Sequence, residues 1–176
     1  MREVHQGLFV GNQDDYEFTV ARQVGWAVVH ACKLPYHKQA LGYTTPAAPR
    51  NHPEYLVARR GSRLMLNIVD ADNAAFFSKE GLIDPALDFI DESRGKELQI
   101  LVHCNQGESR APSIALLYMA ARLGILPTES LEAAEAQFRP LYPNYFPKHG
   151  IRGHLRQYWR QYCADEKRDG RASETD

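Results

Sequence analysis

The stretch Leu98–Ala121 reads Leu-Gln-Ile-Leu-Val-His-Cys-Asn-Gln-Gly-Glu-Ser-Arg-Ala-Pro-Ser-Ile-Ala-Leu-Leu-Tyr-Met-Ala-Ala. Its first residues, 98–102, form a compact apolar run that is typical of a strand buried on both faces of a sheet. A polar loop follows from Cys104 to Arg110, and beyond it apolar residues recur at helical spacing, which predicts a helix packed on the sheet. Pro112 fits the first turn of this helix, where a missing N–H costs nothing. The stretch therefore predicts a buried strand, a polar loop and a helix in direct succession.

The polar loop has the residue types of an anion-binding site with a nucleophile at its base. Backbone N–H groups of a tight loop that enters a helix N-terminus converge on one point and attract an anion. The same N–H groups, the helix dipole and a nearby guanidinium favour the thiolate form of a cysteine such as Cys104. Arg110 can hold two phosphate oxygens at once, and Gly107 lets the loop turn without a Cβ in the way. These residues predict a cysteine nucleophile that faces a phosphate.

The loop sequence resembles the signature of a known superfamily. His103-Cys104-Asn105-Gln106-Gly107-Glu108-Ser109-Arg110 is similar to the signature loop of the cysteine-dependent protein tyrosine phosphatases, and most similar to that of their compact dual-specificity branch. Residues 7–11, 68–72 and 86–90 resemble that branch's opening strand, the stretch ending in its general-acid loop, and the helix before its catalytic strand. The resemblance spans roughly residues 4–160. It implies a phosphocysteine intermediate on Cys104, substrate binding by residues 105–110, and a loop-orienting role for His103.

The proton donor is expected in the acidic turn Asp70-Ala71-Asp72-Asn73, which follows an apolar strand signal at 64–69. Cleavage of a phosphate ester needs a proton on the leaving oxygen, because an alkoxide or phenolate departs poorly at neutral pH. By register against the family pattern, Asp72 matches the general acid, and Asp70 is the alternative. Both residues could instead serve the turn, since Asp commonly bonds its own backbone there. A mobile loop would suit a donor that must swing in.

Two residues in or next to the signature loop, Ala111 and Glu108, are unusual. The family usually has Ser or Thr directly after the arginine, where the hydroxyl helps the thiolate leave in the second step, but this chain has Ala111. Ser109 and Ser113 lie on either side, and neither obviously substitutes. Loss of one charge-assisted hydrogen bond would slow hydrolysis of the phosphocysteine by ~10–100-fold. Glu108 is expected to point outward, because inside the loop it would repel phosphate.

Composition and length favour one globular domain. A chain of 176 residues with 44% hydrophobic content can bury one core and is too short for two comfortable domains. We expect a catalytic domain over 1–164 and a polar, frayed tail over 165–176. The net charge of −1 gives no general attraction to nucleic acid or to an anionic membrane. No cofactor is expected, and no metal, because no His/Asp/Cys cluster has metal-ligand spacing.

The number of cysteines and the N-terminal residues indicate in which cellular compartment the protein is expected. Three cysteines, an odd number, argue against a disulfide framework and for a reducing setting. Residues 1–5 lack the apolar core of a signal peptide, and no run approaches membrane-spanning length. We therefore expect a cytoplasmic enzyme whose partner is a phosphorylated protein or peptide. The oligomeric state is left open by the sequence.

The rest of the sequence alternates strand and helix signals, as in α/β domains. Strands are predicted at 8–10, 26–31 and 64–69, besides the one at 98–102. Helices are predicted at 16–24, from Asp84-Pro85 to about Gly95, after Arg110, from 127 to about 138, and at 151–163. The segment 139–147 reads as irregular. This alternation predicts a mostly parallel sheet of four to five strands with helices on both faces.

Residues 34–62 depart from the compact family pattern. Four prolines and two glycines forbid a long regular element there, and the segment is basic: Lys38, Arg50, Arg59 and Arg60 with His37 and His52, against Glu54 alone. It could be an ordinary solvated surface loop. Alternatively, since it follows the carboxyl end of a strand, it could form a basic flap beside the signature loop. A basic flap would favour an acidic phosphopeptide or a polyphosphorylated ligand.

A protein phosphatase acting on phosphotyrosine is the favoured hypothesis, extending to phosphoserine and phosphothreonine if the pocket is shallow. The same chemistry on inositol polyphosphates, phosphoinositides or RNA 5′-phosphates is motivated by the basic insert and opposed by Glu108 and the near-neutral charge. A phospho-binding pseudophosphatase is motivated by Ala111 and opposed by the presence of Cys104 and Arg110. A rhodanese-like sulfur transferase would leave the acidic turn at 70–73 unexplained.

Overall fold

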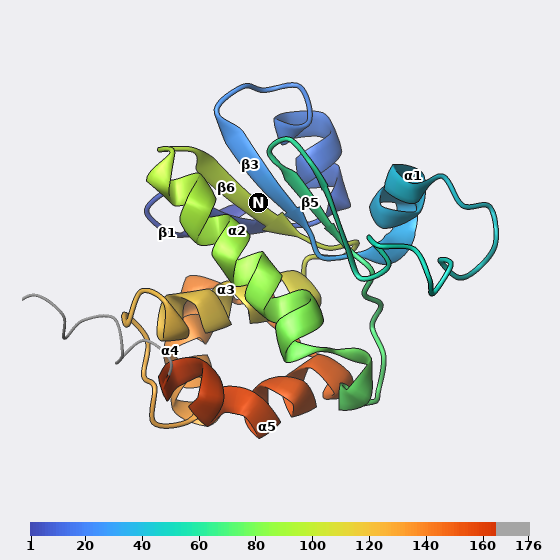
Figure 1. The fold of residues 1–176 in the computed structure, drawn as a ribbon. Helices are drawn as coiled ribbons and strands as arrows, with labels where there is room; N and C mark the ends of the chain where they lie inside the picture. The colour runs from blue at the N-terminus through green and yellow to red at the C-terminus, as the bar shows by residue number, and fades with distance from the viewer. Residues whose placement is uncertain (165–176) are drawn as a thin grey trace, which may run out of the picture.

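A computed structural model describes residues 1–164 as a six-stranded sheet with helices on both of its faces (Figure 1). The tail predicted at 165–176 lies outside the described residues. The strands are β1 (Arg2–His5), β2 (Leu8–Gly11), β3 (Trp26–His30), β4 (Val57–Arg60), β5 (Arg63–Leu66) and β6 (Gln99–His103). They lie in the order β1-β2-β6-β3-β5-β4, with β2, β6, β3 and β5 parallel and the two outermost strands antiparallel. The mostly parallel α/β fold is confirmed, with short edge strands beyond the expected four to five.

The α-helices of the described residues lie on one face of the sheet or against its edge. They are α1 (Lys38–Leu41), α2 (Asp84–Gly95), α3 (Arg110–Ala121), α4 (Leu131–Leu141) and α5 (His149–Ala164). Helices α2 and α3 pack on the central strands, α4 and α5 pack on α3, and α1 lies off to the side with the insert (Figure 1). The other face is covered more thinly, by the π-helical turns η1 (Asp15–Val20) and η2 (Lys33–His37). Short turns η3 (Ala74–Phe76) and η4 (Lys79–Ile83) precede α2.

The central strand β6 shows why the apolar run at 98–102 predicts burial on both faces. Ile100, Leu101 and Val102 have no exposed surface. Ile100 and Val102 belong to the main core with α2 and α3, whereas Leu101 packs with Tyr16 on the opposite side. Every residue of the following helix α3 is buried, so the helix is apolar all round, as an inner helix must be. The strand, loop and helix thus form the centre of the molecule.

Element ends differ from the predicted ones where capping or edge pairing decides them. Helix α4 begins at Leu131 rather than near 127, because the Ser130 hydroxyl accepts a hydrogen bond from the N–H of Ala133 and caps it. The same helix runs on through Pro140 to Leu141, into the segment expected to be irregular. Residues 57–60 of the insert form β4, an edge strand that pairs with β5. The expected helix at 16–24 is a shorter π-helical turn, η1.

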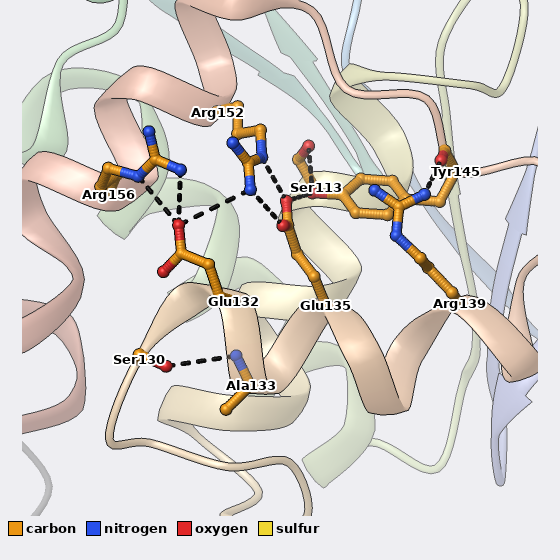
Figure 2. A network of polar contacts seen from close by, with 9 residues as sticks. All are labelled: Ser113, Ser130, Glu132, Ala133, Glu135, Arg139, Tyr145, Arg152 and Arg156. Carbon is orange, nitrogen blue, oxygen red and sulfur yellow. Dashed lines mark hydrogen bonds and ion pairs between the residues drawn. The ribbon is translucent and has the colours of Figure 1, made fainter.

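A polar network joins α3, α4 and α5 on the side away from the sheet, as Figure 2 shows. The Glu135 carboxylate, 4% exposed, accepts hydrogen bonds from Arg152 Nε (2.8 Å), Arg152 Nη2 (2.6 Å) and the Tyr145 hydroxyl (3.3 Å). The Ser113 hydroxyl in turn donates to Tyr145 at 3.5 Å, and Arg139 donates to the Tyr145 carbonyl at 2.9 Å. A bidentate arginine and a phenol compensate this buried charge, so the network fixes α5 against the helix that carries the signature arginine.

Buried histidines form part of the packing on both sides of the sheet. His30 Nδ1 and His103 Nε2 share a hydrogen bond of 2.6 Å behind the signature loop, with Tyr16 stacked on His103 and Tyr36 stacked on His30. Burial, reinforced by the neighbouring His103, lowers the pKa of His30 to about 2, and burial lowers the pKa of His103 to about 4. On α5, burial lowers the pKa of His154 to about 4. All three rings are therefore neutral at physiological pH.

Acidification from pH 7 to 5 should lower the free energy of unfolding. The unfolded chain binds protons at these three histidines below its ordinary histidine pKa of about 6.5, whereas the folded chain does not until the pH approaches 4 or lower, so stability is lost as the pH falls. Each histidine contributes at most about 1.4 kcal/mol per pH unit. Urea unfolding across this range measures the slope.

A matched pair of variants on α5 separates this effect from general acid sensitivity. His154→Gln should reduce the slope of the free energy of unfolding against pH by one proton, whereas Gln157→Asn, which replaces an exposed residue of the same helix that carries no titratable group, should leave this slope as in the wild type. A free energy of unfolding that stays constant between pH 7 and 5 would show that the buried rings carry protons in the folded state.

Candidate active site

The signature loop connects the end of β6 to the start of α3 and is held from several sides. The segments that hold it come from the turn after β2, the start of the insert and the connection between α4 and α5. Their hydrogen bonds to the loop are Gln13 N–H to the Asn105 carbonyl (3.3 Å), Asn105 Nδ2 to the Leu34 carbonyl (2.9 Å), the Tyr142 hydroxyl to the Gly107 carbonyl (2.9 Å), Phe146 N–H to the Glu108 carbonyl (2.8 Å) and Lys148 N–H to the Ser109 hydroxyl (3.0 Å). These contacts all use carbonyls and side chains of the loop.

The backbone amides of the loop are left available. Within residues 1–164, no amide from Asn105 to Arg110 donates a hydrogen bond to a protein group. Gly107 has φ +74, and a Cβ there would lie 2.9 Å from the carbonyl oxygen of Gly11, so only glycine lets the loop approach the end of β2. Amides without acceptors in a loop that opens a helix form a cradle suited to an anion.

Cys104 and Arg110 mark the base and the far end of this loop. Cys104 follows β6 directly and is 1% exposed. Arg110, 5% exposed, donates from Nη2 to Asp70 (2.9 Å) and Asn105 (3.1 Å), and from Nη1 to the Ile68 carbonyl (3.3 Å). Its buried Nε–H has no acceptor among the described residues. A guanidinium that spans the loop with one unused donor suits a phosphate oxygen.

The two aspartates of the acidic turn lie in different surroundings. The Asp70 carboxylate forms the ion pair with Arg110, and Asp72 is exposed and bonds to none of the residues that the structure describes. The turn itself is capped by Asn73, whose side chain accepts from the Ala75 N–H at 2.9 Å. Neither aspartate side chain therefore serves the turn, and they differ in that Asp70 is paired with Arg110 whereas Asp72 has no partner among the described residues.

The hydroxyls near the loop are engaged away from the sulfur. Ser109 accepts from the Lys148 amide, and Ser113 donates to Tyr145. Ala111 is fully buried and offers no hydroxyl. Glu108 is exposed, in line with the expectation that it points outward. Gln106 borders a polar cavity of about 300 Å³ that is also lined by Asn12, Asp15, Tyr142 and Asn144.

The basic residues of the insert lie at the sheet edge, not over the signature loop. Arg59 forms two hydrogen bonds of 2.7 Å with Glu92, and Arg60 pairs with Glu54 at 2.7 and 2.8 Å. Both arginines belong to β4, which is separated from β6 by β5 and β3. Lys38 donates to the Thr44 carbonyl at 3.0 Å. Arg60 is therefore neutralised within the insert and Arg59 by a carboxylate of α2, whereas Arg50 is exposed. The first residue of the insert, Leu34, touches the loop.

Exposed apolar side chains surround the loop instead. Leu34 is 51% exposed, Val69 45% and Phe146 60%. Each adjoins the loop through the backbone: Leu34 and Phe146 by direct hydrogen bonds, and Val69 as the neighbour of Ile68, which accepts from Arg110. We call these three residues the apolar rim. Sequence reasoning missed them, because single exposed hydrophobic residues in loops have no periodicity.

The segment between α4 and α5 is a second feature that sequence reasoning missed. Tyr142, Phe146 and Lys148 all contact the signature loop, although the segment reads only as irregular. A usable signal was its aromatic content, with Tyr142 and Tyr145 buried in a connection that a plain surface loop would leave polar.

Two further properties concern the described residues 1–164 as a whole. They contain no group of three or more His, Cys, Asp or Glu side chains arranged to hold a metal ion. None of their helices combines the length and apolarity required to cross a bilayer.

Known proteins similar to this chain are dual-specificity phosphatases. No protein-family model matches the sequence. Human dual specificity protein phosphatase 6 is 32% identical over 60 residues, which cover 34% of this chain and 16% of that protein. Dual specificity protein phosphatase 1 of Arabidopsis thaliana is 27% identical over 141 residues, which cover 80% of this chain and 62% of that protein. The chain thus spans less than two thirds of the length of these relatives.

Solved structures share the fold over nearly the whole chain. The human tyrosine phosphatase-like serine/threonine/tyrosine-interacting protein aligns with a TM-score of 0.64 at 20% identity, covering 92% of this chain and 97% of that one. Human DUSP28 aligns with a TM-score of 0.62 at 18% identity, covering 94% of this chain and 99% of that one. DUSP15 aligns with a TM-score of 0.62 at 18% identity, covering 98% of each chain. In sequence this chain is thus similar to dual-specificity phosphatases, and it shares the fold of solved structures that include DUSP28 and DUSP15.

Proposed function

We propose that residues 1–164 form a single catalytic domain that hydrolyses phosphotyrosine in proteins or peptides through a phosphocysteine intermediate. The observation that carries this proposal is the buried Cys104 at the base of a loop whose amides lack protein acceptors and which the Arg110 guanidinium spans. All three cysteines of the chain are free thiols, which supports a cytoplasmic, reducing location for a thiolate enzyme.

In the first step, the Cys104 thiolate attacks phosphorus in line with the leaving oxygen. An S–P bond forms, the P–O bond breaks, and the loop amides with Arg110 stabilise the charge on the equatorial oxygens. An aspartic acid gives its proton to the departing phenolate. In the second step, the same residue, now a carboxylate, takes a proton from water, which attacks phosphorus and releases inorganic phosphate and the thiolate. The loop and guanidinium supply the positive charge that this reaction needs, so no metal or other cofactor is invoked.

We assign the proton transfer to Asp72 and a positioning role to Asp70. The Asp70 carboxylate is committed to Arg110 at 2.9 Å, where it orients the guanidinium. Asp72 has no such partner among the described residues and lies two residues along the same exposed turn, so it is the carboxyl that can approach a leaving oxygen. This division gives each carboxylate one role.

The structure favours a peptide over a polyphosphate as the substrate. A polyanionic ligand would need several unpaired cations near the loop, but Arg59 and Arg60 are paired with carboxylates at the far edge of the sheet. The apolar rim suits a phosphorylated residue with an aromatic ring and apolar neighbours.

A second candidate function, phosphopeptide binding without turnover, is favoured by one observation. Ala111 stands where the family has a hydroxyl, and Ser109 and Ser113 are both engaged elsewhere. The second step is therefore short of one hydrogen bond to the departing sulfur, and the phosphocysteine is expected to persist.

Phosphate release from a substrate panel tests the proposed function. Phosphotyrosine peptides should be hydrolysed, whereas inositol hexakisphosphate and 5′-triphosphate RNA should not, because the insert offers them no free cluster of cations. Cys104→Ser should abolish release while vanadate still binds, since only the nucleophile is removed. Preferred hydrolysis of the polyphosphates, or turnover by Cys104→Ser near the wild-type rate, would contradict the assignment.

Leaving-group dependence distinguishes the two aspartates. Asp72→Asn should lower kcat/KM by about 10²-fold for phenyl phosphate, which needs a proton, and far less for 2,4-dinitrophenyl phosphate, which does not. Asp70→Asn should instead affect both substrates alike, because it disturbs Arg110. The opposite pattern would move the general acid to Asp70.

Pre-steady-state kinetics test the role of Ala111. The wild type should release one equivalent of phenol in a burst and then turn over slowly, and Ala111→Ser should raise the slow rate by about tenfold. Ala111→Gly is the control and should keep the slow rate. Steady turnover without a burst in the wild type would show that the second step is not slow and would contradict this role of Ala111.

A further inference from the structure

We infer that residues 146–150, which we call the strap, set the position of the acidic turn relative to the signature loop, with Gly150 as the positioning residue. This inference rests on the proposed function, because it concerns where the proton donor stands. It does not depend on which aspartate is the donor, since the residue held by the strap is Ala71, between Asp70 and Asp72.

Three alternate backbone amides of the strap reach the two halves of the site. Phe146 N–H donates to the Glu108 carbonyl (2.8 Å) and Lys148 N–H to the Ser109 hydroxyl (3.0 Å), both in the signature loop. Gly150 N–H donates to the carbonyl of Ala71 (3.1 Å) in the acidic turn. Phe146 and Lys148 precede α5, and Gly150 lies in its first turn, where amides have no partner within the helix, so the bond from Gly150 costs the helix nothing.

Gly150 is required by the closeness of this contact. A Cβ at position 150 would lie 2.0 Å from the Ala71 carbonyl oxygen, 2.9 Å from its carbonyl carbon and 3.1 Å from the Phe77 ring. No residue with a side chain therefore fits at position 150 unless the Ala71 carbonyl moves. The acidic turn is thus seated on the backbone of α5, where no side chain can intervene.

The neighbouring Gly153 shows that the requirement is local. It lies three residues further along α5, and a Cβ there would meet the Ala74 Cβ at 3.5 Å, an ordinary van der Waals contact. Both glycines face the segment 71–77, but only Gly150 excludes a methyl group. Alanine at the two positions therefore makes a matched pair, with equal change in composition and unequal effect on the acidic turn.

The polar network of Figure 2 holds the start of α5, which contacts the acidic turn, in a fixed position. Arg152, two residues after Gly150, is held by both oxygens of the buried Glu135. The start of α5 is therefore fixed against α4, so a collision at position 150 displaces the acidic turn and not the helix.

Leaving-group dependence in the two variants tests the inference. Gly150→Ala should lower kcat/KM about tenfold more for phenyl phosphate than for 2,4-dinitrophenyl phosphate, because the displaced turn carries the donor, and any accompanying disturbance of Arg110 affects both substrates alike. Gly153→Ala should match the wild type with both substrates. Equal losses for both substrates in Gly150→Ala, or no loss, would overturn the inference.

Two further measurements keep the test decisive. In a variant in which the aspartate identified as the donor by leaving-group dependence is replaced by Asn, Gly150→Ala should cause no further loss that is specific to phenyl phosphate. An additive loss specific to that substrate would overturn the assignment of Gly150 to donor positioning. Phe77→Leu, which removes ring contact from the other side of the seat, should give the same leaving-group signature in a smaller degree, should Gly150→Ala not fold.

Hydrogen exchange separates a failure of this inference from a failure of the proposed function. If the wild type hydrolyses no phosphate ester, the proposed function has failed, and the strap is then judged by amide exchange over residues 69–77. Exchange there should be faster in Gly150→Ala than in Gly153→Ala, because the seat of the turn is lost. Equal exchange in the two variants would overturn the inference on its own.

Discussion

A buried positive charge on Arg110 constrains the arrangement of the whole site. Removing a guanidinium from water costs several kcal/mol unless it is paired and hydrogen-bonded. Arg110 meets this requirement with Asp70, Asn105 and the carbonyl of Ile68, which come from the acidic turn, the signature loop and the segment after β5. These three segments cannot move apart without leaving a buried charge unpaired, so the position of the proposed proton donor and that of the proposed phosphate cradle are linked through one side chain.

The strap links the same two halves from the opposite side and by backbone contacts. Arg110 connects the acidic turn to the loop through an ion pair, which a bound phosphate would compete for. The Gly150–Ala71 bond involves no charged group and is not exposed to that competition. The turn therefore keeps a fixed anchor at Ala71 even where a bound phosphate competes with Asp70 for Arg110.

The sequence predicts the centre of this molecule well because its signals are local and strong. The apolar run at 98–102, the polar loop and the apolar helix after Arg110 each carry their own pattern, and β6 and α3 lie where these patterns place them. The edge strand β4 escaped prediction because it has only four residues, two of them exposed arginines, inside a segment rich in proline. Pairing with β5 makes it a strand, and pairing is a property of two segments at once.

Contacts between distant residues account for the parts of the site that the sequence does not predict. The insert looks basic because its arginines are visible and their partner Glu92 lies more than thirty residues away. His103 looks like a lone histidine until β3 brings His30 to its ring, and Gly150 looks like a weak point in a helix until Ala71 is seen against it. In each case the residue type is readable from the sequence, whereas its role depends on a neighbour that only the fold supplies.

The two candidate functions, phosphatase and phosphopeptide binder, differ in the rate at which the proposed phosphocysteine is hydrolysed. Cys104, Arg110, the loop amides and an acidic turn supply all that the first step needs. The second step lacks one hydroxyl, at Ala111, and a charge-assisted hydrogen bond of this kind corresponds to a factor of ~10–100 in rate. On the proposed mechanism, a chain with these residues would take up a phosphoryl group readily and give it up slowly. The lifetime of the covalent intermediate therefore decides which of the two functions dominates.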